Sequence, residues 1–240
     1  RPCCYDKGRM TLEAYLPALV PPPRRGTRCR GPRVCHRLDF RVCGPVVVGT
    51  SEEAVRAIKR SFEQRTVSKE YRAIVCGTPG RPGDAFTVDA PLDGETAQTG
   101  VRVLQVAPCP HFGVISELAL VPVTGRHQQL RRHCAKVLGT PIVNEERALF
   151  EAAAPEWSRR NNTPLPPYVT RGGGSLFLQA VQVDVPPLQG GGESVSVRIE
   201  VSDRFPRLLR TSARAWEEGW RMDADGQTFR VEGGLEANMH

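Results

Sequence analysis

The sequence predicts an α+β domain with a large mixed or antiparallel sheet and flanking helices. Many segments either alternate apolar and polar residues or are continuously apolar, whereas only two segments have a well-marked helical period. Strand–helix–strand crossover units are few, which argues against a mainly parallel sheet. No internal repeat is apparent, which argues against a solenoid.

The first part of the chain predicts a short helix over residues 11–16, ended by Pro17, and a buried strand over the apolar residues 43–49. Thr50 is the expected N-cap of the first well-marked helix, because Glu53 follows three residues later and completes a capping box. We expect this amphipathic helix over residues 52–64.

Six further segments predict strands from their alternation or their apolar character. They are residues 69–76, 86–89, 100–106, 113–123, 176–185 and 194–201. The second well-marked helix is expected over residues 126–138, where apolar side chains form one stripe and Gly139 is suited to a C-terminal cap. Residues 151–174 are rich in proline and glycine and predict an inserted loop.

We divide the chain into an irregular N-terminal extension (residues 1–33), a core domain (34–210) and a C-terminal tail (211–240). The 33 Lys and Arg outnumber the 26 Asp and Glu, and the resulting charge of +7 favours a polyanionic partner over solubility alone. No apolar run approaches the roughly 20 residues that a membrane helix needs, so no membrane partner is expected.

The 8 cysteines are scattered, and none forms a C-x-x-C pair, which argues against a zinc ribbon or a redox dithiol. We therefore expect reduced thiols and an intracellular, reducing compartment. The arginine-rich character and the absence of an initial Met hint at a mitochondrion.

Asp39 is the first candidate for chemistry. It lies two residues after Arg37, beside His36, and before an apolar run, so partial burial next to basic groups is expected. An isolated Asp at such a place is more often a turn residue.

A second basic motif, residues 124–133, opens the helix expected at residue 126. Arg131 lies one position off its apolar stripe and can reach inward, where it needs a carboxylate partner. Asp39 is the candidate partner, and a solvated basic helix face is the alternative.

Tyr71 is the third candidate, on the strand that begins at Lys69. It is either a core residue or a ring that stacks on an unstacked base, with Lys69 and Arg72 facing phosphate. The histidines lack a convincing metal-ligand spacing, and the sequence has neither a phosphate-binding glycine loop nor a nucleophile elbow.

The run from Val34 to Val185 resembles the RluA family of RNA pseudouridine synthases, because several motifs match in the same order. These are His36-Arg37-Leu38-Asp39, residues 65–73 with Tyr71, residues 91–97, residues 124–126 with 129–131, residues 141–143 and the strand at 176–185.

The resemblance implies isomerisation of uridine to pseudouridine in structured RNA, expected to be rRNA, without metal or organic cofactor. It implies that Asp39 is the catalytic carboxylate, that Tyr71 packs on the uracil and that Arg131 holds Asp39 ionised. Residues expected to bind the RNA are His36, Arg37, Lys69, Arg72, Arg126 and Gln129. Eversion of a base costs a few kcal/mol, offset by stacking and phosphate contacts.

The sequence differs from the family pattern at three places: Val42-Cys43 replaces Thr-Ser, His127-Gln128 replaces Thr-His, and Asn144-Glu145 replaces Gly-Asp. Two hypotheses follow. The chain is a working RNA pseudouridine synthase, or it is an inactive RNA-binding component of a mitochondrial ribosome or its assembly, with ribosomal or assembly proteins as partners. In the second case Asp39 persists as a structural partner of Arg131.

Overall fold

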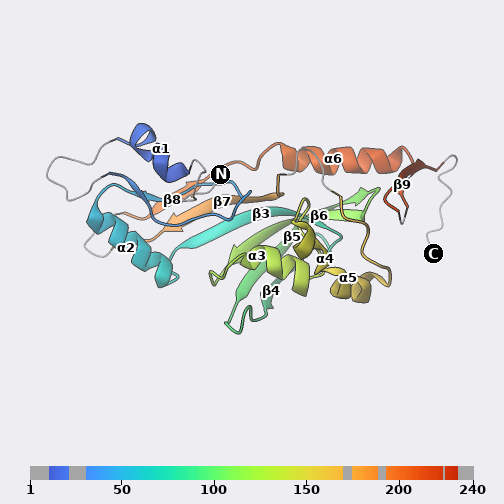
Figure 1. Cartoon of the computed structure of the whole chain (residues 1–240), viewed down its shortest axis with the longest axis horizontal. Helices are drawn as coiled ribbons and strands as arrows, with labels where there is room; N and C mark the ends of the chain where they lie inside the picture. Colours follow the sequence, from blue (N-terminus) through green and yellow to red (C-terminus); the bar gives the residue numbers. More distant parts are fainter. Residues whose placement is uncertain (1–10, 22–30, 170–174, 189–192, 224, 232–240) are drawn as a thin grey trace.

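The computed structural model describes residues 11–21, 31–169, 175–188, 193–223 and 225–231. A six-stranded sheet forms its centre. Helix α6 (Arg204–Glu217) lies on one side, and α3 (Gln129–Arg132), α4 (Arg147–Glu151) and α5 (Ala154–Asn161) lie on the other (Figure 1). The predicted α+β class is confirmed.

The sheet is antiparallel throughout, in the order β4-β5-β6-β3-β7-β8. Its strands are β3 (Ser68–Cys76), β4 (Ala85–Asp89), β5 (Gln98–Cys109), β6 (Gly113–Pro122), β7 (Leu178–Val185) and β8 (Val195–Arg198). Most match their predicted ranges closely, but β5 is longer than residues 100–106 and β8 is shorter than residues 194–201. Strong alternation therefore located the strands better than it located their ends.

Strand β3 lies between β6 and β7 and positions Tyr71. In the pairing register Tyr71 is opposite Leu120 of β6 and Ala180 of β7, and a bulge separates it from Glu70 on the β7 side. Further along β3, Ala73 and Ile74 are wholly buried. Tyr71 therefore sits where the fully covered core gives way to a partly open surface.

The segment before β3 differs from its prediction. Only Val48–Gly49 form a strand (β2), paired with β1 (Arg33–Val34), so the expected strand over residues 43–49 is wrong. The segment is mainly a loop whose apolar side chains are partly buried: Val46, together with the preceding Val42, packs against Leu38 and Ala180. Apolar character alone does not distinguish a buried loop from a strand.

Two helix boundaries also need correction. Helix α2 (Glu52–Glu63) is capped by Ser51, whose hydroxyl accepts from Ala54 N at 3.1 Å, and not by Thr50. Helix α1 (Leu12–Leu19) contains Pro17 and continues to Leu19, so the predicted end at Pro17 is wrong. Proline disfavours a helix interior, and this helix ends two residues after it.

The later part of the chain is more regular than the sequence suggested. Helix α5 lies inside the predicted loop of residues 151–174, of which residues 170–174 are outside the described part. Helix α6 crosses the predicted boundary at residue 210. A hairpin of β9 (Trp220–Met222) and β10 (Thr228–Arg230) follows it.

The loop that carries Asp39 crosses the sheet directly over β7. The carbonyl oxygen of Cys43 accepts from Ala180 N at 2.9 Å, and Gly44 has φ of 147°. A Cβ at Gly44 would lie 2.5 Å from both the Cβ and the carbonyl oxygen of Ala180. Glycine is therefore required here by backbone conformation and by close approach together.

We predict that Gly44→Ala lowers the free energy of unfolding by about 2–3 kcal/mol, because the loop must shift away from β7. Gly113→Ala is the matched control, since Gly113 has φ of 71° but no atom lies within 4 Å of its added Cβ. Urea unfolding measures both variants. Equal losses would show that φ alone, and not contact with Ala180, requires the glycine.

A pocket between the Asp39 loop and the basic helix

A pocket of about 300 Å³ lies where the loop after β1, strand β3, the end of β6 and the start of α3 meet. Its lining includes six of the residues expected at the site, namely Asp39, Tyr71, Arg37, Lys69, Arg126 and Gln129. The sequence motifs that carry these side chains are far apart in the chain, and the fold brings them together. The volume lies at the lower end of the range typical of ligand sites.

Asp39 reaches the pocket because its neighbour Leu38 is buried against Tyr71 and Ala180. A turn follows, in which Val42 N donates to the Asp39 carbonyl oxygen at 3.1 Å and Arg41 adopts a left-handed conformation with φ of 71°. Among the residues that the structure describes, none forms an ion pair with the Asp39 carboxylate. This carboxylate is therefore available at the pocket wall.

Tyr71 faces the same pocket from β3. Burial, followed by the nearby negative charge of Asp39, raises the pKa of Tyr71 to about 12. Both effects disfavour the phenolate. At neutral pH Tyr71 therefore presents a neutral aromatic ring next to a carboxylate.

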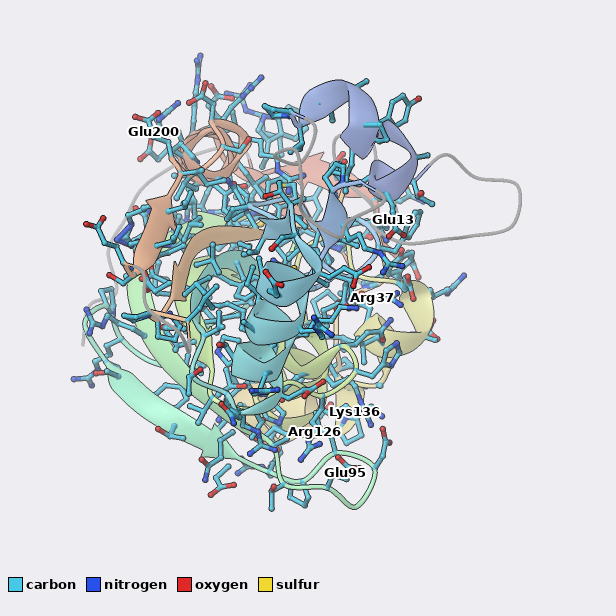
Figure 2. The ribbon with its side chains drawn as sticks, turned by 90° about the vertical axis from the view of Figure 1, so that its left-hand side faces the viewer. Glu13, Arg37, Glu95, Arg126, Lys136 and Glu200 are labelled. Atoms are coloured by element: carbon cyan, nitrogen blue, oxygen red, sulfur yellow. The ribbon has the colours of Figure 1, made fainter. Side chains whose placement is uncertain are left out.

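The rim of the pocket is basic. Lys69 Nζ lies 5.5 Å from the centre of the Phe62 ring, and burial lowers the pKa of Lys69. Arg37 is exposed, and Figure 2 shows Arg37 and Arg126 at the end of the molecule that carries α2. Guanidinium and ammonium groups around a pocket suit a phosphate-bearing ligand.

The start of α3 is organised by Gln129, whose side chain is fully used. Its amide oxygen accepts from the Thr124 hydroxyl at 2.6 Å and from Arg126 N at 3.0 Å, and its nitrogen donates to Gln98 O at 2.8 Å and to the Thr99 hydroxyl at 3.0 Å. Gln129 therefore shapes the pocket wall and has little capacity left for a ligand.

The turn between β4 and β5 is tied to this helix by two ion pairs. Arg132 donates to both carboxylate oxygens of Asp93 at 2.7 Å, and Arg126 pairs with Glu95 and donates to Thr96 O at 2.9 Å. Glu95 lies beside Arg126 in Figure 2. These contacts hold Arg126 at the rim.

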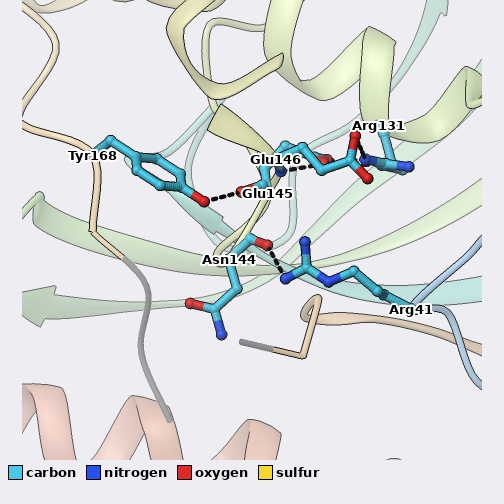
Figure 3. A network of polar contacts seen from close by, with 6 residues as sticks. All are labelled: Arg41, Arg131, Asn144, Glu145, Glu146 and Tyr168. Atoms are coloured by element: carbon cyan, nitrogen blue, oxygen red, sulfur yellow. Dashed lines mark hydrogen bonds and ion pairs between the residues drawn. The ribbon is translucent and has the colours of Figure 1, made fainter. Parts of the chain in front are cut away.

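The expected ion pair between Asp39 and Arg131 is wrong. Arg131 is 1% exposed, and its guanidinium binds the wholly buried Glu145: Nε lies 3.0 Å from each carboxylate oxygen, and Nη2 also pairs with Oε1 (Figure 3). Glu146 lies 3.5 Å from Nη2. Sequence reasoning recognised that Arg131 needs a carboxylate but chose the wrong one.

Arg131 remains electrostatically linked to the pocket, although it does not line it. Burial lowers the pKa of Arg131, but the hydrogen bonds and charge of Glu145, with smaller contributions from Glu146 and Asp39, raise it above its usual value. The guanidinium is therefore charged. Its field reaches Asp39, while its hydrogen bonds go to Glu145.

His36 does not line the pocket. Its Nε2 accepts from Val47 N at 3.0 Å, and its ring stacks on Phe62 with centroids 4.7 Å apart. Burial, followed by repulsion from Lys69, lowers the pKa of His36 to about 4. The neutral imidazole therefore fixes the loop that precedes Asp39, and a contact of His36 with RNA stays a prediction.

Arg72 is not at the pocket either, because neighbouring residues of a strand point to opposite faces. It lines a groove on the other face of the sheet and contacts Glu70 and Glu117 at 3.3 and 3.7 Å. The expectation that Arg72 faces phosphate beside Tyr71 is therefore wrong, whereas Lys69 does line the pocket.

Glu145 and Arg41 are the residues that sequence reasoning missed. A signal was present, since Glu145 follows the apolar Pro141–Val143 run and replaces a residue of the family pattern.

Among the described residues, no group of three His, Cys, Asp or Glu is arranged to hold a metal ion. Within that same part of the chain, no helix has the length and apolar character needed to span a membrane.

Comparisons with known proteins find a matching family model and several relatives. Residues 13–136, just over half of the chain, match the family model described as RNA pseudouridylate synthase. An uncharacterized RNA pseudouridine synthase of Chloroflexus aurantiacus is 33% identical over 151 residues, which are 57% of this chain and 45% of that protein. The dual-specificity RNA pseudouridine synthase RluA of Escherichia coli is 35% identical over 125 residues, covering 46% and 54%.

The fold also matches a solved structure. Human RNA pseudouridylate synthase domain containing 4 superposes with a TM-score of 0.57 at 21% identity, over 85% of this chain and 84% of that one. This likeness concerns the fold alone. The chain spans about half the length or less of the curated relatives it matches.

We predict that Arg131→Met lowers the free energy of unfolding by about 3–5 kcal/mol, because it leaves the buried Glu145 carboxylate unpaired. The double variant Arg131→Met/Glu145→Met should recover most of this loss, since apolar side chains replace both charges. Arg126→Met is the control: its partner Glu95 is exposed, so its ion pair is worth less than about 1 kcal/mol. Similar losses for Arg126→Met and Arg131→Met in urea unfolding would contradict the assignment.

A pH dependence follows from His36. Its pKa is lower in the folded protein, so the unfolded chain binds more protons below pH 6.5 and the stability contributed at neutral pH is lost as the pH falls from about 6.5 to 4. Between pH 7 and pH 5 this amounts to about 2 kcal/mol. His36→Gln, which keeps an acceptor for Val47 N, should reduce the pH dependence of urea unfolding by that amount. An unchanged dependence would show that His36 titrates normally in the folded protein.

Proposed function

Because the chain belongs to the RNA pseudouridylate synthase family, we propose that it isomerises uridine in RNA to pseudouridine. In this reaction the bond from uracil N1 to ribose C1′ breaks, the uracil turns, and a bond forms between C5 and C1′. The C5 proton leaves and N1 gains a proton, so the product is an isomer of the substrate. No metal or organic cofactor is needed for this balance.

The observation that carries the proposal is the free carboxylate of Asp39 in a pocket whose wall is a neutral aromatic ring. Asp39 makes no structural ion pair within the described residues, although a partly buried carboxylate is costly unless it is paired or used. Tyr71 supplies a flat apolar surface on which a base can stack. Asp39 is the proposed catalytic residue, and Tyr71 is the proposed base contact.

The basic rim supplies the binding free energy that opening the RNA requires. Removal of one base from a stack costs a few kcal/mol, which phosphate contacts and stacking on the protein offset. Arg37, Lys69 and Arg126 are the proposed phosphate or nucleotide contacts. Arg131 lies behind the pocket and does not line it, but its positive charge interacts with Asp39.

The substrate class that we propose is structured RNA, with rRNA as the first candidate. The charge of +7 and the basic rim favour a large polyanion. A mitochondrial location is part of the same proposal, and one relative is an RNA pseudouridine synthase of Arabidopsis thaliana whose name describes it as mitochondrial. Mapping of pseudouridine in organellar and cytosolic rRNA from cells with and without the protein tests both points.

The alternative is an inactive RNA-binding component of a ribosome or of its assembly. It is favoured by Val42 and Cys43 at positions where the family pattern has hydroxyl groups. It is disfavoured by Asp39, because the structural reason for retaining this residue, an ion pair with Arg131, is absent. The working enzyme is therefore the better supported proposal.

We predict that Asp39→Asn abolishes pseudouridine formation and changes RNA affinity by less than about threefold, because it removes the reacting carboxylate and preserves the shape of the pocket. The readout is release of tritium from RNA whose uridines are labelled at C5. Asp89→Asn, on β4 and outside the pocket, is the matched control and should keep the activity.

Transcripts of the rRNAs and total RNA from cells lacking the protein are the substrates for this test. Product formation by Asp39→Asn at the rate of the unaltered protein would contradict the assigned role. RNA binding by the unaltered protein without tritium release from either pool would favour the inactive alternative.

A further inference from the structure

The groove that Arg72 lines is a cavity to which the proposed function assigns no role. Its volume of about 580 Å³ exceeds that of the pocket at Asp39 and lies within the range typical of ligand sites. Every residue that lines it belongs to a strand, and α6 packs against β5 without contributing to it. The groove and the pocket lie on opposite faces of the sheet, because Arg72 and Tyr71 are neighbours on β3.

The groove is hollow because small residues occupy the middle of this face. In the register of the sheet, Ala119 of β6 is paired with Arg72 on one side and with Arg102 on the other. Gly100 lies on the same face of β5, two residues before Arg102, and is paired with Val121. The backbones that carry the two arginines are therefore about 10 Å apart, with a floor of small side chains between them.

Three arginines from three strands line this groove. Arg102 is exposed and, among the residues that the structure describes, forms no ion pair. The Arg72 guanidinium lies 3.3 Å from Glu70 and 3.7 Å from Glu117, and its Nε–H makes no hydrogen bond within the described part of the chain. Arg198 donates to both oxygens of Glu70, at 3.0 and 3.1 Å. With Glu70 as its one carboxylate, the lining carries a net positive charge.

Charge and shape together indicate the class of partner. The centre of a protein–protein interface is usually poor in charged residues and buries aromatic or other large anchors. Here guanidinium groups surround a floor that includes Gly100 and Ala119, so a partner gains charged contacts and buries little apolar surface. Guanidinium groups bind phosphate oxygens in pairs, and phosphate contacts supply much of the affinity for nucleic acids.

We propose that this groove binds the phosphate backbone of RNA at a site separate from the pocket, with Arg102 as the main contact and Arg72 and Arg198 beside it. That this RNA is the one modified at the pocket rests on the proposed function. An RNA that contacts both faces of the sheet must fold around it, so the groove favours structured RNA over a short single strand.

The charge arm of the test compares Arg102→Gln with the control Arg210→Gln, which removes an exposed arginine of α6 that lines neither cavity. Fluorescence anisotropy measures binding of a fluorescein-labelled rRNA transcript from about 0.05 to 0.2 M KCl. We expect Arg102→Gln to raise Kd about fivefold and to lower the slope of log Kd against log salt by about 0.7–1, because one phosphate contact is lost. Equal changes in Arg210→Gln would show that affinity follows net charge and would overturn the proposal.

The shape arm fills the groove without a change of charge. Ala119→Leu places a larger side chain between Arg72 and Arg102, whereas the control Ala119→Ser keeps the hollow open. We expect Ala119→Leu to raise Kd for the transcript about fivefold and Ala119→Ser to change it by less than about twofold. Thermal unfolding shows that both variants are folded. Equal affinities of the two variants would overturn the proposal.

Neither arm depends on turnover, so failure of the groove and failure of the proposed function are distinguishable. Unchanged affinity in Arg102→Gln and Ala119→Leu overturns the groove even if the protein releases tritium from RNA. Weakened binding in both variants supports the groove even if no tritium is released. Labelled poly-L-glutamate is the second probe: a loss of affinity for this polymer alone would identify an acidic polypeptide as the partner and overturn the assignment to RNA.

Discussion

The buried ion pair between Arg131 and Glu145 is the constraint on which the rest of the site depends. A guanidinium at 1% exposure requires a carboxylate with good geometry, and Glu145 provides it from a segment that also pairs with the central strand: Val143 N donates to Ile74 O at 2.8 Å. The pair therefore joins the helix behind the pocket to β3, which carries Tyr71. The positions of the ring, the cation and the neighbouring loop become interdependent.

The helix that contains Arg131 is irregular. Four residues of α3 continue into the π-helix η1 (His133–Val137), where Leu138 N donates to His133 O at 3.0 Å. π-turns are uncommon and are frequent at functional sites. The irregular turn begins at His133, two residues after Arg131, and His133 is anchored by the Thr99 hydroxyl at 2.9 Å and Ala90 O at 3.1 Å. Helix α3 is thus fixed to β5 and to the end of β4.

The sequence predicted the strands and six of the residues that line the pocket, because both depend on local patterns. Alternation identified β3, and short motifs placed Asp39, Tyr71 and Arg126. It did not predict the partner of Arg131. Burial of an arginine side chain shows that it needs an acidic partner, but not which of the 26 acidic residues is that partner. Sequence reasoning also mistook residues 43–49 for a strand, since their partial burial comes from a loop that packs against β7 at Gly44.

One departure from the family pattern, Asn144-Glu145, supplies two groups that hold the site together. Asn144 occupies a left-handed position that Gly and Asn tolerate best, and its carbonyl oxygen is the acceptor for Arg41 in the Asp39 turn. Glu145 still supplies a carboxylate, one methylene longer than Asp. The buried Arg131 guanidinium is paired with Glu145, and Asp39 lines the pocket, as its proposed catalytic role requires.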